Sequence, residues 1–247
     1  MSSNTFDLVV IGAGPGGYVC AIRAAQLGMS VAIIEREHMG GICLNWGCIP
    51  AKTMLRSAEV FQLIQRSKEF GLSVDNIKCD LESVISRSKH VANQLSQGVG
   101  FLLKKNKIDV ILGEAKLTGK GKVHISGKGG IQTLHAKNLV LATGARAREL
   151  PGIESDSDLI WTYKDALRPK RMPKKLLVIG SGAIGIEFAS FYNTLGSNTT
   201  VVEVMNQILP LEDAEISAFA KKQFEKQGMR FLENATVKEL ERDRGIV

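Results

Sequence analysis

The sequence has no apolar run close to the roughly 20 residues that a membrane-spanning helix requires. Its start has neither the long apolar segment of a secretion signal nor the arginine-rich composition of a transit peptide, and the apolar stretch Leu8–Ile11 runs directly into glycines. Low-complexity tracts are also missing, while 44% of the residues are hydrophobic and 23% are charged. These features predict a globular chain in the cytoplasm, with no membrane partner.

The chain also lacks a concentrated basic region, because its formal net charge of +7 is spread among acidic residues. The one short basic run, Arg168–Lys175, contains no aromatic residue and adjoins an apolar stretch that is typical of a strand. Nucleic-acid interfaces combine basic side chains with aromatic ones or with a recognisable binding motif. We therefore interpret the run as a solvated linker and expect no nucleic-acid partner.

Cysteine is scarce, with residues only at positions 20, 43, 48 and 79. Two of them are close together and two are isolated, which is not the pattern of a secreted disulfide framework. A zinc site would need two further ligands at matching spacing, and none is evident, so we expect no metal. In a reducing compartment, the close pair suggests redox chemistry.

What the sequence does contain is the same βαβ pattern twice, each time with glycines between the first strand and the helix. This repetition predicts an α/β fold of two Rossmann-like three-layer modules, residues 1–150 and 151–247, the second truncated. The expected strand–helix–strand segments are Phe6–Ile11, Pro15–Leu27 and Ser30–Glu35, and then Lys175–Ile179, a helix through Leu195, and Asn198–Glu203.

Between the two patterns, apolar residues at three-to-four spacing predict one amphipathic helix over Leu81–Lys105, after a first helix over Cys48–Arg66. Alternating stretches and glycine-rich turns then predict short strands. The expected strands are Ile108–Leu112, Lys122–Ser126, Ile131–His135 and a buried strand within Asn138–Gly144, and the module boundary is expected near Pro151.

The first glycine cluster fits a dinucleotide-binding fingerprint in its proper context, between a strand and a helix. Gly12 permits a tight turn, Gly14 lets the backbone approach a pyrophosphate, and Gly17 lets the helix pack on the strand. Glu35, at the end of the second strand, can accept hydrogen bonds from ribose hydroxyls. The alternative, a glycine-rich turn without a ligand, does not require an acid at that position.

The second cluster, Gly180, Gly182 and Gly185, repeats the fingerprint, and Glu203 ends the following strand. A carboxylate there accepts from a free ribose 2′-hydroxyl and repels a 2′-phosphate, and no arginine follows it up to Pro210. The pattern therefore favours NAD over NADP. The alternative is an empty structural copy left by internal duplication.

The cysteine pair has a spacing that a regular helix would not close into a disulfide, because the Cα atoms of Cys43 and Cys48 would lie further apart than about 7 Å. Gly47 and Pro50 allow an irregular turn followed by a new helix. A helix N-terminus lowers the pKa of a nearby thiol. Lys52, one turn beyond Cys48, would lower the thiol pKa values further or contact an electron-rich flavin. These features suggest a redox-active dithiol, with a zinc half-site or inert core cysteines as alternatives.

The segment Gly40–Lys52, flanked by the two fingerprints, resembles the flavin-dependent pyridine nucleotide–disulfide oxidoreductases, and most closely their NAD-linked branch that oxidises dihydrolipoyl groups. The resemblance implies that FAD binds to residues 1–150 and NAD to residues 151–247. It implies that Cys43 attacks the substrate and that Cys48 lies next to the flavin. Further roles implied by position are a flavin contact for Lys52, its pairing with Glu187, and a second flavin-side segment at Thr143 and Gly144.

The resemblance also implies partners and a longer protein. The partners would be the lipoyl domain of a dihydrolipoyl acyltransferase or a glycine-cleavage carrier protein, and a second copy in a homodimer. Members of the family are about twice as long, and their acid–base catalyst is a His followed by a Glu five residues later. None of the four histidines here has that Glu, so we expect a fragment with little turnover of its own. The alternatives are an NADPH-dependent disulfide reductase and a short, non-catalytic flavin-binding redox protein.

Overall fold

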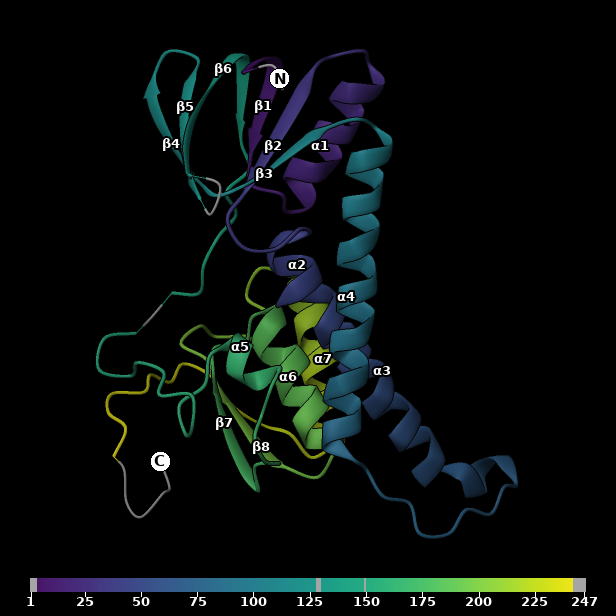
Figure 1. Cartoon of the computed structure of the whole chain (residues 1–247). Coiled ribbons are helices and arrows are strands. Elements are labelled where there is room, and N and C mark those ends of the chain that lie inside the picture. Colours follow the sequence, from purple (N-terminus) through teal and green to yellow (C-terminus); the bar gives the residue numbers. More distant parts are fainter. Residues whose placement is uncertain (1–3, 128–129, 149, 242–247) are drawn as a thin grey trace. The chain divides into compact units, whose positions relative to one another are not determined.

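The computed structural model describes residues 4–127, 130–148 and 150–241 and divides into two compact units (Figure 1). The first unit comprises Met1–Pro50 and Lys89–Arg146, and the second comprises Ala51–Ser88 and Ala147–Val247. Two helices, α3 (Cys48–Gln65) and α4 (Leu81–Lys105), have residues in both units.

The first unit is built around a six-stranded sheet in the order β3-β2-β1-β6-β5-β4. Strands β3, β2, β1 and β6 pair in parallel, whereas β6, β5 and β4 pair antiparallel. The elements of this unit are β1 (Thr5–Ile11), α1 (Pro15–Gln26), β2 (Val31–Glu35), α2 (Gly41–Asn45), β3 (Asp109–Leu112), β4 (Glu114–Gly119), β5 (Lys122–Gly127) and β6 (Gly130–Leu141).

Strand β1 separates two apolar cores in this unit because its side chains alternate between the two faces. Leu8 and Val10 pack with α1 and with the end of α4, whereas Val9 and Ile11 pack with residues of β5 and β6. Figure 1 shows the resulting layers, with helices on one side of the parallel strands and the antiparallel strands on the other. The three-layer arrangement expected for the first module is therefore confirmed.

The antiparallel strands differ from the expectation in three respects. Two expected strands form one continuous strand, β6, whose residues pair with β5 on one side and with β1 on the other. A further strand, β4, was not expected. The expectation that the strand within Asn138–Gly144 is buried is also wrong, because Leu141 at the end of β6 is 63% exposed. Pairing with two neighbours holds β6 extended across the break that the sequence pattern suggests.

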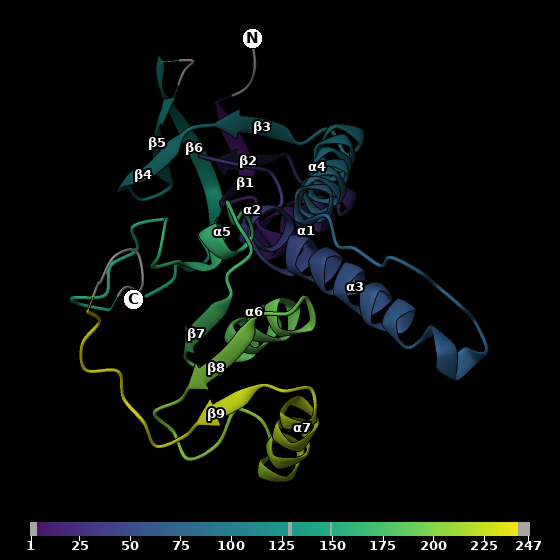
Figure 2. The ribbon, with the colours of Figure 1, turned by 90° about the horizontal axis from the view of Figure 1, so that it is seen from below.

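The second unit contains a parallel three-stranded sheet in the order β7-β8-β9, which is the start of a Rossmann arrangement. Helices α6 and α7 lie on the same side of this sheet (Figure 2). The helix and strand bounds are η1 (Ser67–Phe70), α5 (Tyr163–Ala166), β7 (Lys175–Ile179), α6 (Ala183–Thr194), β8 (Asn198–Val202), α7 (Ala214–Lys226) and β9 (Arg230–Leu232). The repeated βαβ pattern is thus confirmed in both units.

Helix α6 packs on two sides. Ala189 belongs to a core with Val201 of β8 and with Met229. Phe191 and Tyr192 belong to another core that includes Met54 of α3 and Leu167. The Tyr192 hydroxyl donates a hydrogen bond of 2.6 Å to the Ala166 carbonyl oxygen, so this buried polar group is satisfied.

The compact units differ from the simple division at Pro151 in one respect. The chain passes finally into the second unit between Arg146 and Ala147, close to the expected boundary at Pro151. Residues 51–88, which were expected in the first module, group with the second unit instead. The reason is the apolar face of α3, where Ala51, Met54 and Ala58 are buried against the core of α6. The assignment of one cofactor to each module remains a prediction.

Acidification is expected to weaken the first unit through Asp7 at the start of the sheet. The Asp7 carboxylate accepts hydrogen bonds from Lys137 Nζ at 2.7 Å and from the Ser30 hydroxyl at 2.7 Å and backbone N–H at 2.9 Å. The hydrogen bond from Lys137, followed by those from Ser30, lowers the pKa of Asp7 below its ordinary value. A lowered native pKa adds stability above about pH 4, and this contribution is lost as pH falls through the native pKa.

Urea unfolding at about pH 7 and about pH 3 tests this expectation. The wild-type chain should lose more stability between the two pH values than Asp7→Asn does. Asp109→Asn, an exposed carboxylate on β3 of the same sheet, is the matched control and should behave like the wild type. An equal pH dependence in wild type and Asp7→Asn would contradict the expectation.

Candidate functional site

The first glycine fingerprint forms a turn that only glycine fits. Gly12 has a φ of +101°, and a Cβ there would overlap the Ala142 carbonyl oxygen. A Cβ on Gly17 would overlap the Gly12 carbonyl oxygen, so α1 packs directly on the turn after β1. Thr143 and Gly144 directly follow Ala142, and the tertiary structure therefore places this segment beside the turn.

The N-terminus of α1 has the features of an anion site. Its N-cap is Gly14, which provides no side-chain cap, and a Cβ on Gly14 would meet only Gly41 Cα at 3.9 Å. Uncapped N–H groups and the helix dipole favour a phosphate at such a position. Glu35 lies beside this turn, where its carboxylate accepts hydrogen bonds of 2.8 Å from the N–H groups of Ala13 and Glu37. These residues fit the pyrophosphate and ribose of a dinucleotide.

A second glycine turn brings the cysteine segment to this fingerprint. Gly40 and Gly41 have φ values of +89° and +59°, and a Cβ on Gly41 would lie 2.7 Å from Gly14 Cα. The Asn45 side chain closes this turn by donating hydrogen bonds of 2.9 Å to the carbonyl oxygens of Met39 and Gly41. Helix α2, which carries Cys43, therefore starts against the turn that precedes α1.

The cysteine pair lies on either side of a break between two helices. Cys43 is in α2, which ends at Asn45, and Cys48 is the first residue of α3. A Cβ on Gly47 would lie 3.6 Å from Cys43 Cα, so the backbone before Cys48 folds back on Cys43. The expected departure from a regular helix is confirmed.

The other two cysteines lie elsewhere. Cys20 is on α1 and packs against the core of the first unit, and Cys79 precedes α4. Burial, together with the negative charge of Asp80, raises the pKa of the Cys79 thiol. Cys79 is therefore less readily converted to the reactive thiolate than an ordinary cysteine.

The second fingerprint repeats the first one in the second unit. Gly180 has a φ of +96°, and a Cβ on Gly185 would overlap the Gly180 carbonyl oxygen. Gly182 is the N-cap of α6, which has no side-chain cap, and a Cβ on Gly182 would meet nothing within 4 Å. The open space at this helix N-terminus fits a second pyrophosphate.

Glu203, directly after β8, is almost completely buried at 6% exposure. Its Oε2 accepts hydrogen bonds from the Ser181 N–H at 2.8 Å and the Ser181 hydroxyl at 2.6 Å, and its Oε1 accepts one of 2.9 Å from the Met205 N–H. Burial acts to raise the pKa of Glu203, but hydrogen bonds from Ser181, Met205 and Val204 outweigh it and lower the pKa. Glu203 is thus an ionised acceptor, as recognition of a ribose hydroxyl requires.

Lys52 and Glu187 are brought together within the second unit from distant parts of the sequence. The Lys52 Nζ lies 3.1 Å from the Glu187 Oε1, which joins α3 to α6 by an ion pair. Glu187 is on the helix that the second fingerprint opens. The pairing matches the one implied by the family resemblance, whereas the roles of the two residues in catalysis remain predictions.

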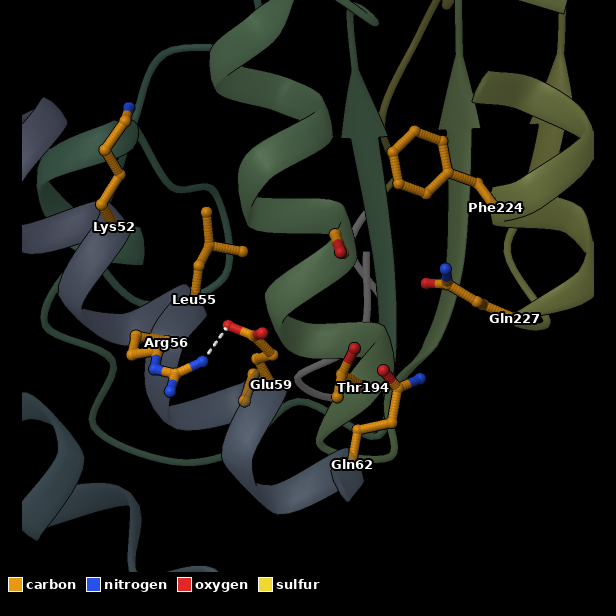
Figure 3. Close-up of a pocket in the computed structure, with 10 residues that line it drawn as sticks. Lys52, Leu55, Arg56, Glu59, Gln62, Thr194, Phe224 and Gln227 are labelled. Atoms are coloured by element: carbon orange, nitrogen blue, oxygen red, sulfur yellow. Dashed lines mark ion pairs between the residues drawn. The ribbon is translucent and has the colours of Figure 1, made fainter. Parts of the chain in front are cut away.

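A cleft of about 470 Å³ lies along α3, α6 and α7 in the second unit (Figure 3). Polar residues alternate with Leu55, Ala58 and Phe224 in its lining, and Arg56 pairs with Glu59 at 2.7 Å on the α3 side. Among the residues singled out from the sequence, only Lys52 lines it. The cleft is therefore distinct from the two glycine fingerprints.

Three residues of the site were missed by sequence reasoning. Gly41 and Asn45 shape the turn that leads to Cys43, and Ser181 holds Glu203. The two consecutive glycines before the cysteines were a usable signal for the turn. No local pattern indicates that the hydroxyl of Ser181 reaches Glu203. The two residues are 22 positions apart in sequence, and they meet because β7 and β8, which they follow, pair side by side.

Comparison with protein families gives one match over almost the whole chain. Residues 6–247 match the model of the family described as pyridine nucleotide-disulphide oxidoreductase. A dihydrolipoyl dehydrogenase from Rhizobium etli is 53% identical over 261 residues, which cover 99% of this chain and 54% of that protein. The chain thus spans about half the length of such curated relatives. None of the helices in the described ranges combines the length and apolarity needed to cross a membrane.

Two solved structures are similar to this chain at 28% sequence identity. LpdA from Mycobacterium tuberculosis matches with a TM-score of 0.87, covering 96% of this chain and 53% of the other. The HOCl-induced flavoprotein disulfide reductase RclA from Escherichia coli matches with a TM-score of 0.83, covering 99% of this chain and 52% of the other.

Proposed function

Because the chain belongs to the pyridine nucleotide–disulphide oxidoreductase family, we propose that it is the FAD- and NAD-binding part of a dihydrolipoyl dehydrogenase. The cysteine pair at the break between α2 and α3 carries this proposal. The identity of 53% to a protein of that name supports the choice within the family.

The proposed reaction begins with thiol–disulfide exchange at the oxidised Cys43–Cys48 pair. One thiolate of a dihydrolipoyl group attacks Cys43 Sγ, the Cys43–Cys48 bond breaks, and Cys48 leaves as a thiolate. The second dihydrolipoyl sulfur then attacks the mixed disulfide and releases the cyclic lipoyl disulfide and the Cys43 thiolate. The dihydrolipoyl group loses two electrons and two protons, and the cysteine pair gains the electrons. One proton is passed on with the electron pair and leaves within the hydride of NADH, and the other is released to solvent.

The remaining residues hold the cofactors. Bound FAD would carry the electron pair from the cysteines to NAD⁺, which accepts it as hydride while the disulfide is restored. Gly12, Gly14 and Glu35 would hold FAD, and the turn from Gly180 to Gly185 with Glu203 would hold NAD. Lys52, oriented by Glu187, would place a positive charge where the reduced flavin is electron-rich.

The proposed setting follows from the same assignment. The partners would be the lipoyl domain of a dihydrolipoyl acyltransferase or a glycine-cleavage carrier protein, together with a second copy of the protein in a homodimer. The paired thiols are suited to the reducing cytoplasm, which we propose as the location. A disulfide reductase that uses NADPH is the second candidate, and the likeness to RclA, which is named a flavoprotein disulfide reductase, favours the disulfide reductase part of it.

Selective oxidation tests the proposed dithiol. The full chain is treated with a mild oxidant, alkylated and digested, and each cysteine is located by mass spectrometry. We expect Cys43 and Cys48 to be joined while Cys20 and Cys79 remain alkylated, and we expect dihydrolipoamide to restore both paired thiols. Alkylation of all four cysteines after oxidation would contradict the proposal. Reduction by glutathione but not by dihydrolipoamide would support the second candidate.

A further inference from the structure

Ser181 occupies an unusual position in the second fingerprint, between Gly180 and Gly182. Its side chain is fully buried, at 0% exposure, although it is polar. Both its N–H and its hydroxyl donate to Glu203 Oε2, at 2.8 and 2.6 Å. A buried hydroxyl with one short hydrogen bond to a carboxylate fixes the position of that carboxylate strongly.

The first fingerprint provides an internal comparison, because Ala13 stands where the second has Ser181. There the Glu35 carboxylate accepts the Ala13 N–H at 2.8 Å but receives no hydroxyl from that residue. The backbone donor is therefore common to both modules, whereas the hydroxyl donor is specific to the second one. The hydroxyl is not needed to form the turn, which indicates another role.

A glutamate side chain has three rotatable bonds, and fixing them in one conformation costs conformational entropy. Ser181 contributes two hydrogen bonds to the Glu203 carboxylate, and the backbone N–H groups of Met205 and Val204 contribute the others named above. Ordering of the carboxylate before a ligand arrives removes this cost from the binding step. The ligand would then meet an acceptor that is already in place.

We propose that Ser181 is a positioning residue that fixes Glu203 for the adenosine ribose of NAD and thereby sets the preference for NAD over NADP. This inference rests on the proposed function, since it assigns a dinucleotide to the second fingerprint. A fixed carboxylate accepts a hydrogen bond from a 2′-hydroxyl and repels a 2′-phosphate. A carboxylate that can rotate away binds the hydroxyl more weakly and repels the phosphate less. The hydroxyl of Ser181 therefore acts on specificity through Glu203, without touching the ligand.

The test is the affinity of the full chain for NADH and for NADPH, each measured by fluorescence titration. We expect Ser181→Ala to weaken NADH binding by roughly tenfold and to lower the ratio of the NADPH dissociation constant to the NADH dissociation constant. Ser181→Cys keeps the shape of the side chain with a somewhat larger sulfur atom and a much poorer donor, so it should give the same result if the alanine variant is unstable. Ser197→Ala is the matched control, because Ser197 is a buried serine of the same unit whose hydroxyl donates to the Pro173 carbonyl oxygen at 2.5 Å.

A double-mutant cycle with Glu203→Ala separates positioning from general destabilisation. If Ser181 acts through Glu203, adding Ser181→Ala to Glu203→Ala changes NADH affinity no further. Additive losses, or a Ser181→Ala variant with the wild-type affinity and preference, would overturn this inference and leave the proposed function intact. Failure of the wild-type chain to bind either dinucleotide would overturn both.

Discussion

In the whole enzyme of the proposed function, replacing either Cys43 or Cys48 by serine is expected to reduce dihydrolipoamide-dependent NADH formation by the FAD-loaded form on the order of 10³-fold or more. Serine cannot form the disulfide that accepts the electrons, so the proposed exchange has no first step. The break between α2 and α3 lies between Cys43 and Cys48, whereas Cys20 is on α1 and Cys79 precedes α4. The measurement is steady-state NADH absorbance with dihydrolipoamide and NAD⁺.

The chain supplies its own controls for this prediction. Cys20→Ser and Cys79→Ser remove thiols outside the break and should keep activity within about twofold of the wild type. FAD content is measured for every variant, so that loss of the cofactor is not mistaken for loss of the dithiol. Activity in Cys48→Ser comparable to that in Cys79→Ser would eliminate the dithiol mechanism.

Gly17→Ala is expected to destabilise the first unit by about 2–3 kcal/mol or more and to abolish FAD retention. The added Cβ would overlap the Gly12 carbonyl oxygen, and α1 would have to move away from the turn after β1. The atoms that the Cβ would overlap are backbone atoms of Gly12, so no flexible side chain can move aside. The measurement is urea unfolding of the chain, followed by the fraction of FAD that remains after gel filtration.

Gly16→Ala is the matched control one residue away on the same helix. A Cβ on Gly16 meets nothing within 4 Å, and the residue has no positive φ. Alanine favours a helix over glycine by about 1 kcal/mol, so Gly16→Ala should unfold at the same or a higher urea concentration than the wild type. Equal destabilisation by both variants would show that the close approach of Gly17 to Gly12 is not what requires glycine there.

Much of the fold could be predicted because it follows from local patterns. The amphipathic spacing gave the bounds of α4 as the structure has them, and alternation between glycine turns and apolar runs located both βαβ units. The antiparallel strands were less predictable. Their side chains alternate irregularly, and β6 is continuous only because β1 and β5 pair with it from two sides.

The candidate site shows the same division. Glycine fingerprints and the cysteine spacing are read directly from the chain, because close backbone approach and a broken helix each restrict the residue type locally. The ion pair between Lys52 and Glu187 joins residues far apart in sequence, and only the resemblance to a family suggested it. Gly41 against Gly14 was not foreseen at all.

The two glycine fingerprints, the close cysteine pair and the acids after the second strands can be read from the chain alone, because each depends on residue type at short, fixed spacing. The packing of α3 with α6, the approach of the cysteine segment to the first fingerprint and the contact of Ser181 with Glu203 arise only when the chain folds. These contacts depend on which apolar faces are buried together and on which polar groups must be satisfied once buried. Such choices are made between distant segments, and no local pattern encodes them.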